Sequence, residues 1–460
     1  DAGELRVTER RSPARATVYR PDIGGLLPLY VADRYDGIDA RPFPDLSDDE
    51  VARYIDANVA AVRDVAARAR PDVALAHHLV LGPAVLARAL DDVPYAVKVH
   101  GSALEYTVKP HPRFRPFAAE GLARARGILV GSRHTAESLW AAMDDASLPA
   151  HTRLGPPGVD VARFAPREPE EAAAGLARLR QRLAASGAAE PRAEAPTTAG
   201  AAAASSFARD VGEAVSALDT IEAGDRVVVF VGKLIRSKGV ELLLGAWPLV
   251  LAREPRARLV IVGFGAFRPG LERLAETLAA GDLEAASQIP GEDGGALTQL
   301  AAFLETAGDD YRAAAAALRG RVAFVGRLDH AELADLLPAA EAMAVTSTFP
   351  EAFGMVAAEA AACGALPVVA NHSGLGEVAR TLAQAVPEEA RPWLSFEVGP
   401  DAVPQLARAL SGWLAAPGDL RARTRAAMVE ATRARYSWDG VARTVVAAGL
   451  GELSDLPEPA

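Results

Sequence analysis

Two lysines bracket a loop that follows an expected strand, in the segment FVGKLIRSKGV at residues 230–240. The strand ends at Val231, Gly232 permits the turn, and Lys233 and Lys238 flank the loop before the next helix. Ammonium groups beside the free amides of a helix start form an anion site that suits a diphosphate. The spacing is not that of a P-loop. Two solvated lysines are the alternative, but the chain has only four lysines, which favours a functional role.

Two glutamates form the second candidate, in the segment PEAFGMVAAE at residues 350–359. Glu351 lies in the loop after a buried strand, and Glu359 lies on a helix of small and apolar residues. Such a carboxylate can accept hydrogen bonds from ribose hydroxyls. A dipole charge at Glu351 and an ion pair at Glu359 are the structural alternatives. The main-chain amides at the helix start would face a phosphate, and they belong to Phe353, Gly354 and Met355.

His100 directly follows the expected strand YAVKV, which places its imidazole at the carboxyl end of that strand. An imidazole there can donate a hydrogen bond to a sugar oxygen or ease charge in a transition state. A lone histidine more often has a structural role, and Lys98 and Glu105 nearby leave the question open. His77 and His78 follow the preceding strand, but no third ligand lies at helical spacing, so we predict no metal site.

Composition excludes several classes of protein. The chain has 49 Lys and Arg against 60 Asp and Glu, a net charge of −11, so nucleic acid is not an expected partner. Cys363 is the only cysteine, which excludes an intramolecular disulfide and favours a reducing compartment. The turn VIVGFGAFRPG has Arg268 where a dinucleotide turn needs its third glycine, so no nicotinamide cofactor is expected.

Apolar runs that alternate with amphipathic helices predict an α/β fold of two Rossmann-like, doubly wound parallel-sheet domains. Two such domains facing a cleft suit a two-substrate transfer, because ligands bind outside the carboxyl ends of the strands. The expected parts are an N-terminal domain at 1–165, an Ala-rich linker or insertion at 166–224, a C-terminal domain at 225–430, and a C-terminal helix and tail at 431–460.

Finer patterns predict single elements. Ser47 and Glu50 form a capping box for a helix that ends near residue 69. One helical stretch is expected over 401–435 and a second over 438–448, and the order of the insertion at 281–320 is left open.

Taken in order, these segments resemble the retaining glycosyltransferases of family 4, which have the GT-B fold. The signature is the Glu-x7-Glu element formed by Glu351 and Glu359. The supporting motifs are GKLIRSKG, the VHG turn at His100, GPPGVD at 155–160, FVGRL at 324–328 and RYSWDGVA near the C-terminus. The resemblance covers most of residues 70–165 and 225–450.

The resemblance implies a nucleotide-diphosphate sugar as donor and transfer with retention to a sugar, lipid or small-molecule acceptor that the sequence does not identify. Glu351 would contact the donor sugar, Glu359 the ribose and His100 the sugar. Lys233 and Lys238 would neutralise the departing diphosphate, so no metal or other cofactor is expected. The donor-binding group adds Gly232 and the helix-start residues Phe353, Gly354 and Met355, with Arg327 and Leu328 bordering the nucleobase. A cytoplasmic location is expected, with peripheral contact to a membrane left open.

Three features depart from the family pattern. Lys233 stands where the family usually has Arg. The SGG pattern after a later strand reads Ser373-Gly374-Leu375-Gly376. The first strand and its glycine-rich loop are missing, because Asp22-Ile23-Gly24-Gly25 follows no such strand, so the N-terminal domain is expected to be incomplete.

A catalytically inactive sugar-nucleotide-binding protein on the same fold is the main alternative, since fold alone does not separate the two. The presence of Glu351, Lys233 and Lys238 favours the enzyme. A GT-B-like epimerase or phosphorylase is disfavoured, because the C-terminal region offers no lysine for a pyridoxal cofactor.

Overall fold

A computed structural model describes residues 6–11, 16–22, 25–29, 41–187 and 211–459. The chain divides into two compact units. The first domain comprises Asp1–Pro157 with Asp439–Ala460, and the second domain comprises Gly158–Trp438. None of the described helices is long and apolar enough to cross a membrane.

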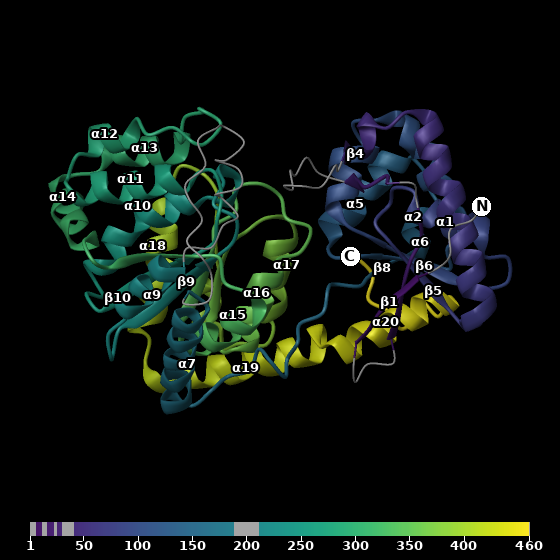
Figure 1. The fold of residues 1–460 in the computed structure, drawn as a ribbon. Coiled ribbons are helices and arrows are strands. Elements are labelled where there is room, and N and C mark those ends of the chain that lie inside the picture. The colour runs from purple at the N-terminus through teal and green to yellow at the C-terminus, as the bar shows by residue number, and fades with distance from the viewer. Residues whose placement is uncertain (1–5, 12–15, 23–24, 30–40, 188–210, 460) are drawn as a thin grey trace. The chain divides into compact units, whose positions relative to one another are not determined.

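A parallel four-stranded sheet forms the centre of the first domain, with the strand order β5-β6-β7-β8 (Figure 1). The strands are β5 (Ala74–His77), β6 (Tyr95–Val99), β7 (Gly127–Val130) and β8 (Thr152–Leu154). Every residue of β6 and β7 is buried, as expected for strands covered on both faces.

One helix, α1, precedes these strands, and the other helices connect them. The helices are α1 (Asp48–Ala69), α2 (Gly82–Ala89), α3 (Gly101–Ala103), the π-helical turn η2 (Leu104–Val108), η3 (Pro112–Phe114), α4 (Arg115–Arg124), α5 (Arg133–Met143) and α6 (Leu148–His151). The predicted capping box is confirmed, because the Glu50 amide donates to Ser47 Oγ and the Ser47 amide donates to Glu50 Oε2.

Short strands precede α1. They are the antiparallel pair β1 (Arg6–Arg11) and β2 (Ala16–Arg20), and the parallel pair β3 (Pro28–Leu29) and β4 (Arg41–Pro42), followed by η1 (Phe43–Asp45). In the segment Asp22-Ile23-Gly24-Gly25, Ile23 and Gly24 lie outside the described residues.

The second domain has a parallel six-stranded sheet with the order β11-β10-β9-β12-β13-β14. The strands are β9 (Arg226–Val231), β10 (Ala257–Val262), β11 (Val322–Gly326), β12 (Ala342–Val345), β13 (Leu366–Ala370) and β14 (Ser395–Phe396). The chain builds outward from β9 through β10 and β11, then returns to place β12 on the other side of β9. The carboxyl ends of β9 and β12 therefore mark the topological switch point, where open α/β sheets bind ligands.

Helices surround this sheet. Those before and among the first three strands are α7 (Pro169–Gly187), α9 (Val211–Asp219), η4 (Arg236–Lys238), α10 (Val240–Leu251), α11 (Arg268–Ala279), α12 (Leu283–Ser287), α13 (Thr298–Thr306), α14 (Asp309–Ala315) and η5 (Ala316–Leu318). Those that follow are α15 (His330–Leu336), η6 (Leu337–Ala339), α16 (Met355–Ala362), α17 (Ser373–Ala383), η7 (Glu388–Trp393), α18 (Ala402–Ala415) and α19 (Gly418–Tyr436). The insertion at 281–320 is thus mostly helical.

The expected linker differs from the structure where residues are described. Helix α7 is tied to α15, because Arg167, Arg178 and Arg182 lie 2.8, 3.3 and 2.8 Å from the carboxylate of buried Asp335. Residues 166–187 and 211–224 therefore belong to the second domain, and 188–210 lie outside the described residues.

The C-terminal helices also differ from expectation. The stretch predicted over 401–435 is two helices, because Ala416 precedes Pro417 and takes an extended conformation. Helix α20 (Trp438–Leu450) carries the chain back to the first domain, where Ala448 packs with Ala96 and Leu129. Residues 439–460 are therefore part of the first domain rather than a separate tail.

Candidate functional site

The loops after β9 and β12 meet at the switch point through one ion pair. Lys238 Nζ donates to Oε1 of Glu351, and Ser347 Oγ donates to the same oxygen at 2.5 Å. The Thr346 hydroxyl donates to the carbonyl of Lys238 at 2.8 Å, which fixes the lysine's main chain. Both charged side chains are about a quarter exposed, so water and a ligand can reach them. The structure thus brings together two residues that the sequence placed in separate candidates.

Glu351 is held on its main-chain side by the turn that follows β13. Its amide donates to Ser373 Oγ at 2.9 Å, and its carbonyl accepts from the amide of Gly374 at 2.9 Å. His372 Nε2 lies 2.8 Å from the carbonyl of Ser347 and must donate to it, which leaves Nδ1 to accept from Ser373 Oγ at 3.0 Å. This chain of hydrogen bonds orients the carboxylate.

The residues that hold Glu351 were missed in the sequence. Ser347 and the pair His372-Ser373 come soon after β12 and β13, at the same edge of the sheet as Lys238, and that shared position is the signal that could have found them. Ser373 has a φ of 49°, a conformation that non-glycine residues seldom adopt and that often marks functional sites. Gly374 is required, because a Cβ there would lie 2.5 Å from the Cα of Phe353.

The start of α16 presents main-chain rather than side-chain groups. Gly354 has a φ of 137°, and a Cβ there would lie 2.6 Å from Leu375 Cδ2. Phe353 is buried and packs edge-on against Tyr436 with ring centroids 5.3 Å apart, so its amide is the group it can offer to a ligand. Met355 is exposed.

The lysine loop rests directly on the glycine-rich turn after β10. A Cβ on Gly263 would lie 1.8 Å from the carbonyl oxygen of Gly232, and one on Gly265 would lie 2.3 Å from that of Leu234. Because these glycines have no Cβ, the backbone of the turn after β10 can pack directly against the backbone of the lysine loop. Lys233 is exposed on this loop.

The residues expected at the nucleobase divide into one exposed and one buried side chain. Arg327 lies over the ring of Phe264 at 5.9 Å, on the exposed side of the turn after β11. Leu328 is buried in the core, so only its main chain could border a base.

Acidic residues of the insertion contact the lysine loop, which the sequence did not indicate. The amide of Arg236 donates to both carboxylate oxygens of Glu292, at 2.8 and 3.0 Å, and its guanidinium donates to Asp293 at 2.7 Å. The amide of Gly295 and the Arg236 side chain hold the pKa of Asp293 below its ordinary value.

Glu359 contacts His330. The carboxylate of Glu359 is buried on α16, and its Oε1 lies 3.4 Å from His330 Nε2 at the start of α15. Burial raises the pKa of Glu359, while His330 acts in the opposite direction. An exposed histidine and a buried carboxylate thus form a separate polar pair, three residues along the chain from Arg327.

His100 lies in a cluster of histidines in the first domain. Its Nε2 is 3.0 Å from Nδ1 of His77, with the rings stacked at 5.3 Å, and the ring of His78 lies 4.6 Å away. Burial, together with smaller contributions from the neighbouring His78, His77 and Lys98, lowers the pKa of His100 to about 3. His100 is therefore not a lone histidine, and its neighbours come from the adjacent strand and not from helical spacing.

Lys98 lies beside this cluster on β6. Its side chain is buried, and its Nζ donates to the carbonyl of Pro156 at 3.3 Å. Burial lowers the pKa of Lys98 to about 8. Glu105 does not pair with Lys98; its carboxylate lies 2.7 Å from Nζ of Lys109.

Metal ligands do not cluster in the described part of the chain. No group of three or more His, Cys, Asp or Glu side chains there is arranged to hold a metal ion.

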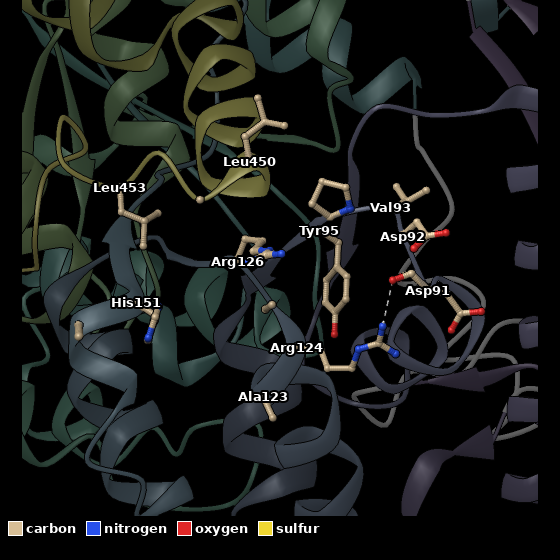
Figure 2. A pocket seen from close by; sticks show the side chains of 14 residues that line it. Asp91, Asp92, Val93, Tyr95, Ala123, Arg124, Arg126, His151, Leu450 and Leu453 are labelled. Carbon is tan, nitrogen blue, oxygen red and sulfur yellow. Dashed lines mark hydrogen bonds between the residues drawn. The ribbon is translucent and has the colours of Figure 1, made fainter.

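A hollow of about 930 Å³ lies at the amino ends of the strands in the first domain's sheet (Figure 2). Its lining includes Tyr95 and Arg126, which stand at the amino ends of β6 and β7, and Leu453 of the C-terminal segment. In this hollow the guanidinium of Arg124 donates hydrogen bonds to the carbonyls of Leu90 and Asp91, at 3.0 and 3.4 Å. His77 and His100 lie at the other, carboxyl, ends of the strands of this sheet.

Comparison with known proteins finds a family likeness within the second domain. Residues 225–308 and 307–393 match two family models, both described as glycosyl transferases group 1. Residues 225–393 are thus similar to the glycosyl transferases of group 1.

Two curated relatives extend the likeness along the chain. An uncharacterized glycosyltransferase of Methanocaldococcus jannaschii is 26% identical over 227 residues, 49% of this chain. A D-inositol 3-phosphate glycosyltransferase of Actinosynnema mirum is 28% identical over 356 residues, 73% of this chain. The matched regions span 45% and 65% of the lengths of these relatives.

Solved structures establish the fold. Sucrose-phosphate synthase of Thermosynechococcus elongatus matches 90% of this chain and 79% of its own, with a TM-score of 0.52 and 20% identity. Anabaena HepE, solved in complex with UDP, matches 86% of this chain and 82% of its own, with a TM-score of 0.51 and 19% identity. The fold is GT-B, and the predicted fold class of two Rossmann-like domains is confirmed.

Proposed function

We propose that this chain is a retaining glycosyltransferase, which moves a sugar from a nucleotide-diphosphate donor to an acceptor. The contact between Lys238 and Glu351 carries the proposal, because it places a cation and a carboxylate together at the switch point of the second domain. A diphosphate needs the first group, and sugar hydroxyls need the second.

Donor binding would rearrange this ion pair. The diphosphate would take over Lys238 and the exposed Lys233, with the main-chain amides at the start of α16 as further donors. The carboxylate of Glu351, still oriented by Ser347 and the His372-Ser373 turn, would then accept hydrogen bonds from the donor sugar.

Transfer would break the bond between the anomeric carbon and the diphosphate oxygen and form a bond from that carbon to the acceptor oxygen on the same face. The lysines stabilise the negative charge that develops on the diphosphate, which then takes the acceptor's proton. Glu351 would stabilise the positive charge that develops on the sugar. These groups would supply the electrostatic stabilisation without a metal or other cofactor.

The remaining predicted residues would bind other parts of the donor. Glu359, with His330 at 3.4 Å, would hold the ribose, and the exposed Arg327 would border the base. A contact of His100, a residue of the first domain, with the donor sugar stays a prediction. Since the similar HepE was solved with UDP, uridine nucleotides are the first donors to test.

Incubation with a panel of sugar nucleotides, with nucleoside diphosphate release as the readout, tests this function. Wild type should release nucleoside diphosphate slowly from one donor by hydrolysis and faster with an acceptor, and Glu351→Gln should not. Donor binding without turnover under either condition would instead identify a catalytically inactive sugar-nucleotide-binding protein.

A further inference from the structure

Lys98 is a buried ammonium without a carboxylate partner in the part of the chain that the structure describes. Lys98 is 6% exposed. Among the described residues, its three N–H groups make one hydrogen bond, of 3.3 Å, to the carbonyl of Pro156. Burying a charge with unsatisfied donors is costly, so such a group usually has an anion close by. The same N-terminal region pairs its exposed Lys109 with Glu105, which shows the ordinary arrangement.

The neighbours of Lys98 are also hydrogen-bond donors. Lys98 is the register partner of His77 across the parallel pair β5–β6, so both side chains lie on one face of the sheet. His100 follows Lys98 by two residues at the carboxyl end of β6, and its ring is stacked on that of His77. His78, the third ring of the cluster, also packs on His100.

The hydrogen bond between His77 and His100 leaves one imidazole N–H for a ligand. In neutral rings, if Nδ1 of His77 donates, then His100 carries its proton on Nδ1. If Nε2 of His100 donates, then His77 carries its proton on Nε2. In both cases one imidazole N–H is left over. Together with the two N–H groups of Lys98 that do not bind Pro156, the cluster offers three hydrogen-bond donors.

We propose that Lys98, His77 and His100 form a phosphate site, which binds a phosphomonoester group carried by the acceptor. Three donors match the three terminal oxygens of a phosphomonoester, and its negative charge supplies the partner that Lys98 lacks. The strand ends that carry the site are where Rossmann-like sheets bind ligands. The assignment to the acceptor rests on the proposed glycosyl transfer, whereas the phosphate site itself does not.

Nuclear magnetic resonance of the lysine side chains tests the site directly, because the whole chain has four lysines. The probe is inorganic phosphate, titrated against chloride at equal ionic strength. Burial places the pKa of Lys98 at about 8, and we expect phosphate to raise it by about one unit or more, while the signal of Lys109 stays unchanged. A Lys98 signal that ignores phosphate, or that responds equally to chloride, would overturn the proposal.

Variants and a sugar phosphate extend the test. We expect Lys98→Met to weaken phosphate binding about tenfold or more by calorimetry, and Lys109→Met to leave it within about twofold. Glucose 6-phosphate should shift the Lys98 signal and glucose should not; a response to inorganic phosphate alone would overturn the assignment to an acceptor. UDP affinity should survive Lys98→Met, because Lys98 and Lys238 lie in different domains, so loss of this site and loss of donor binding are separate outcomes.

Discussion

Lys238 Nζ donates to Oε1 of Glu351 across 113 residues of sequence. This contact gives the lysine a counter-ion and the carboxylate an orientation, at the place where the strand order of the second sheet reverses. In the proposed donor complex, the diphosphate replaces Glu351 as the partner of Lys238.

Replacing Lys238 by Met should weaken nucleoside diphosphate binding. One charge-assisted hydrogen bond contributes about 1.5–3 kcal/mol, which corresponds to a loss of affinity of roughly ten- to a hundredfold. Calorimetry with UDP measures the effect. Lys109→Met is the matched control, since Lys109 also pairs with a glutamate but lies in the first domain. An equal effect of both substitutions would contradict the role of Lys238.

Ser373→Ala should lower kcat while leaving UDP affinity nearly unchanged. The hydroxyl accepts from the Glu351 amide at 2.9 Å and does not itself touch the donor in the proposed complex. We expect about a tenfold fall in kcat, and a loss of about 1 kcal/mol in unfolding free energy from the lost hydrogen bond. If kcat stays unchanged while stability falls, Ser373 is structural and does not position Glu351.

Glu241→Gln should alter how stability depends on pH. Glu241 lies on α10, its Oε2 is buried without a hydrogen-bond partner among the described residues, and burial raises its pKa to about 7. The folded chain therefore keeps a proton that the unfolded chain loses above pH ~4.5, so this carboxyl costs stability as pH rises toward 7.

Urea unfolding from pH 4 to pH 8 checks this prediction. The Gln variant and wild type should be similar near pH 4, and the variant should be more stable by up to about 3 kcal/mol at pH 8. A difference that does not change with pH would show that Glu241 titrates normally.

Asp335→Asn should destabilise the second domain by about 2–3 kcal/mol, since one buried carboxylate pairs with three arginines of the α7 region. Burial would raise the pKa of Asp335, but Arg167 and Arg182 hold it below its ordinary value. Asp219→Asn is the control, because Asp219 is exposed and its pair with Arg180 should contribute less than about 1 kcal/mol. Equal losses in thermal unfolding would contradict an anchoring role for Asp335.

Sequence patterns predicted the parallel strands well, because buried β-branched runs separated by helices have few other solutions. The same patterns placed Lys238 after one strand and Glu351 after another. The two side chains meet because these strands, β9 and β12, are neighbours in the sheet. The histidine cluster was not predictable in this way, since His77 and His100 meet through strand pairing rather than local spacing.

The limits of the predicted domains have a similar cause. Nothing in the composition of 166–187 indicates that its arginines pair with Asp335, a contact that depends on tertiary structure. The return of α20 to the first domain depends likewise on Ala448 packing against two distant strands.

Turnover by Glu351→Gln tests the central claim most directly. The amide keeps the shape of the side chain but removes the charge proposed to face the reacting sugar. With the donor that wild type turns over, we predict a loss of about a hundredfold or more in kcat, with the thermal unfolding midpoint within a few degrees of wild type. Near-normal turnover by this variant would contradict the proposed role of Glu351 and the site built around it.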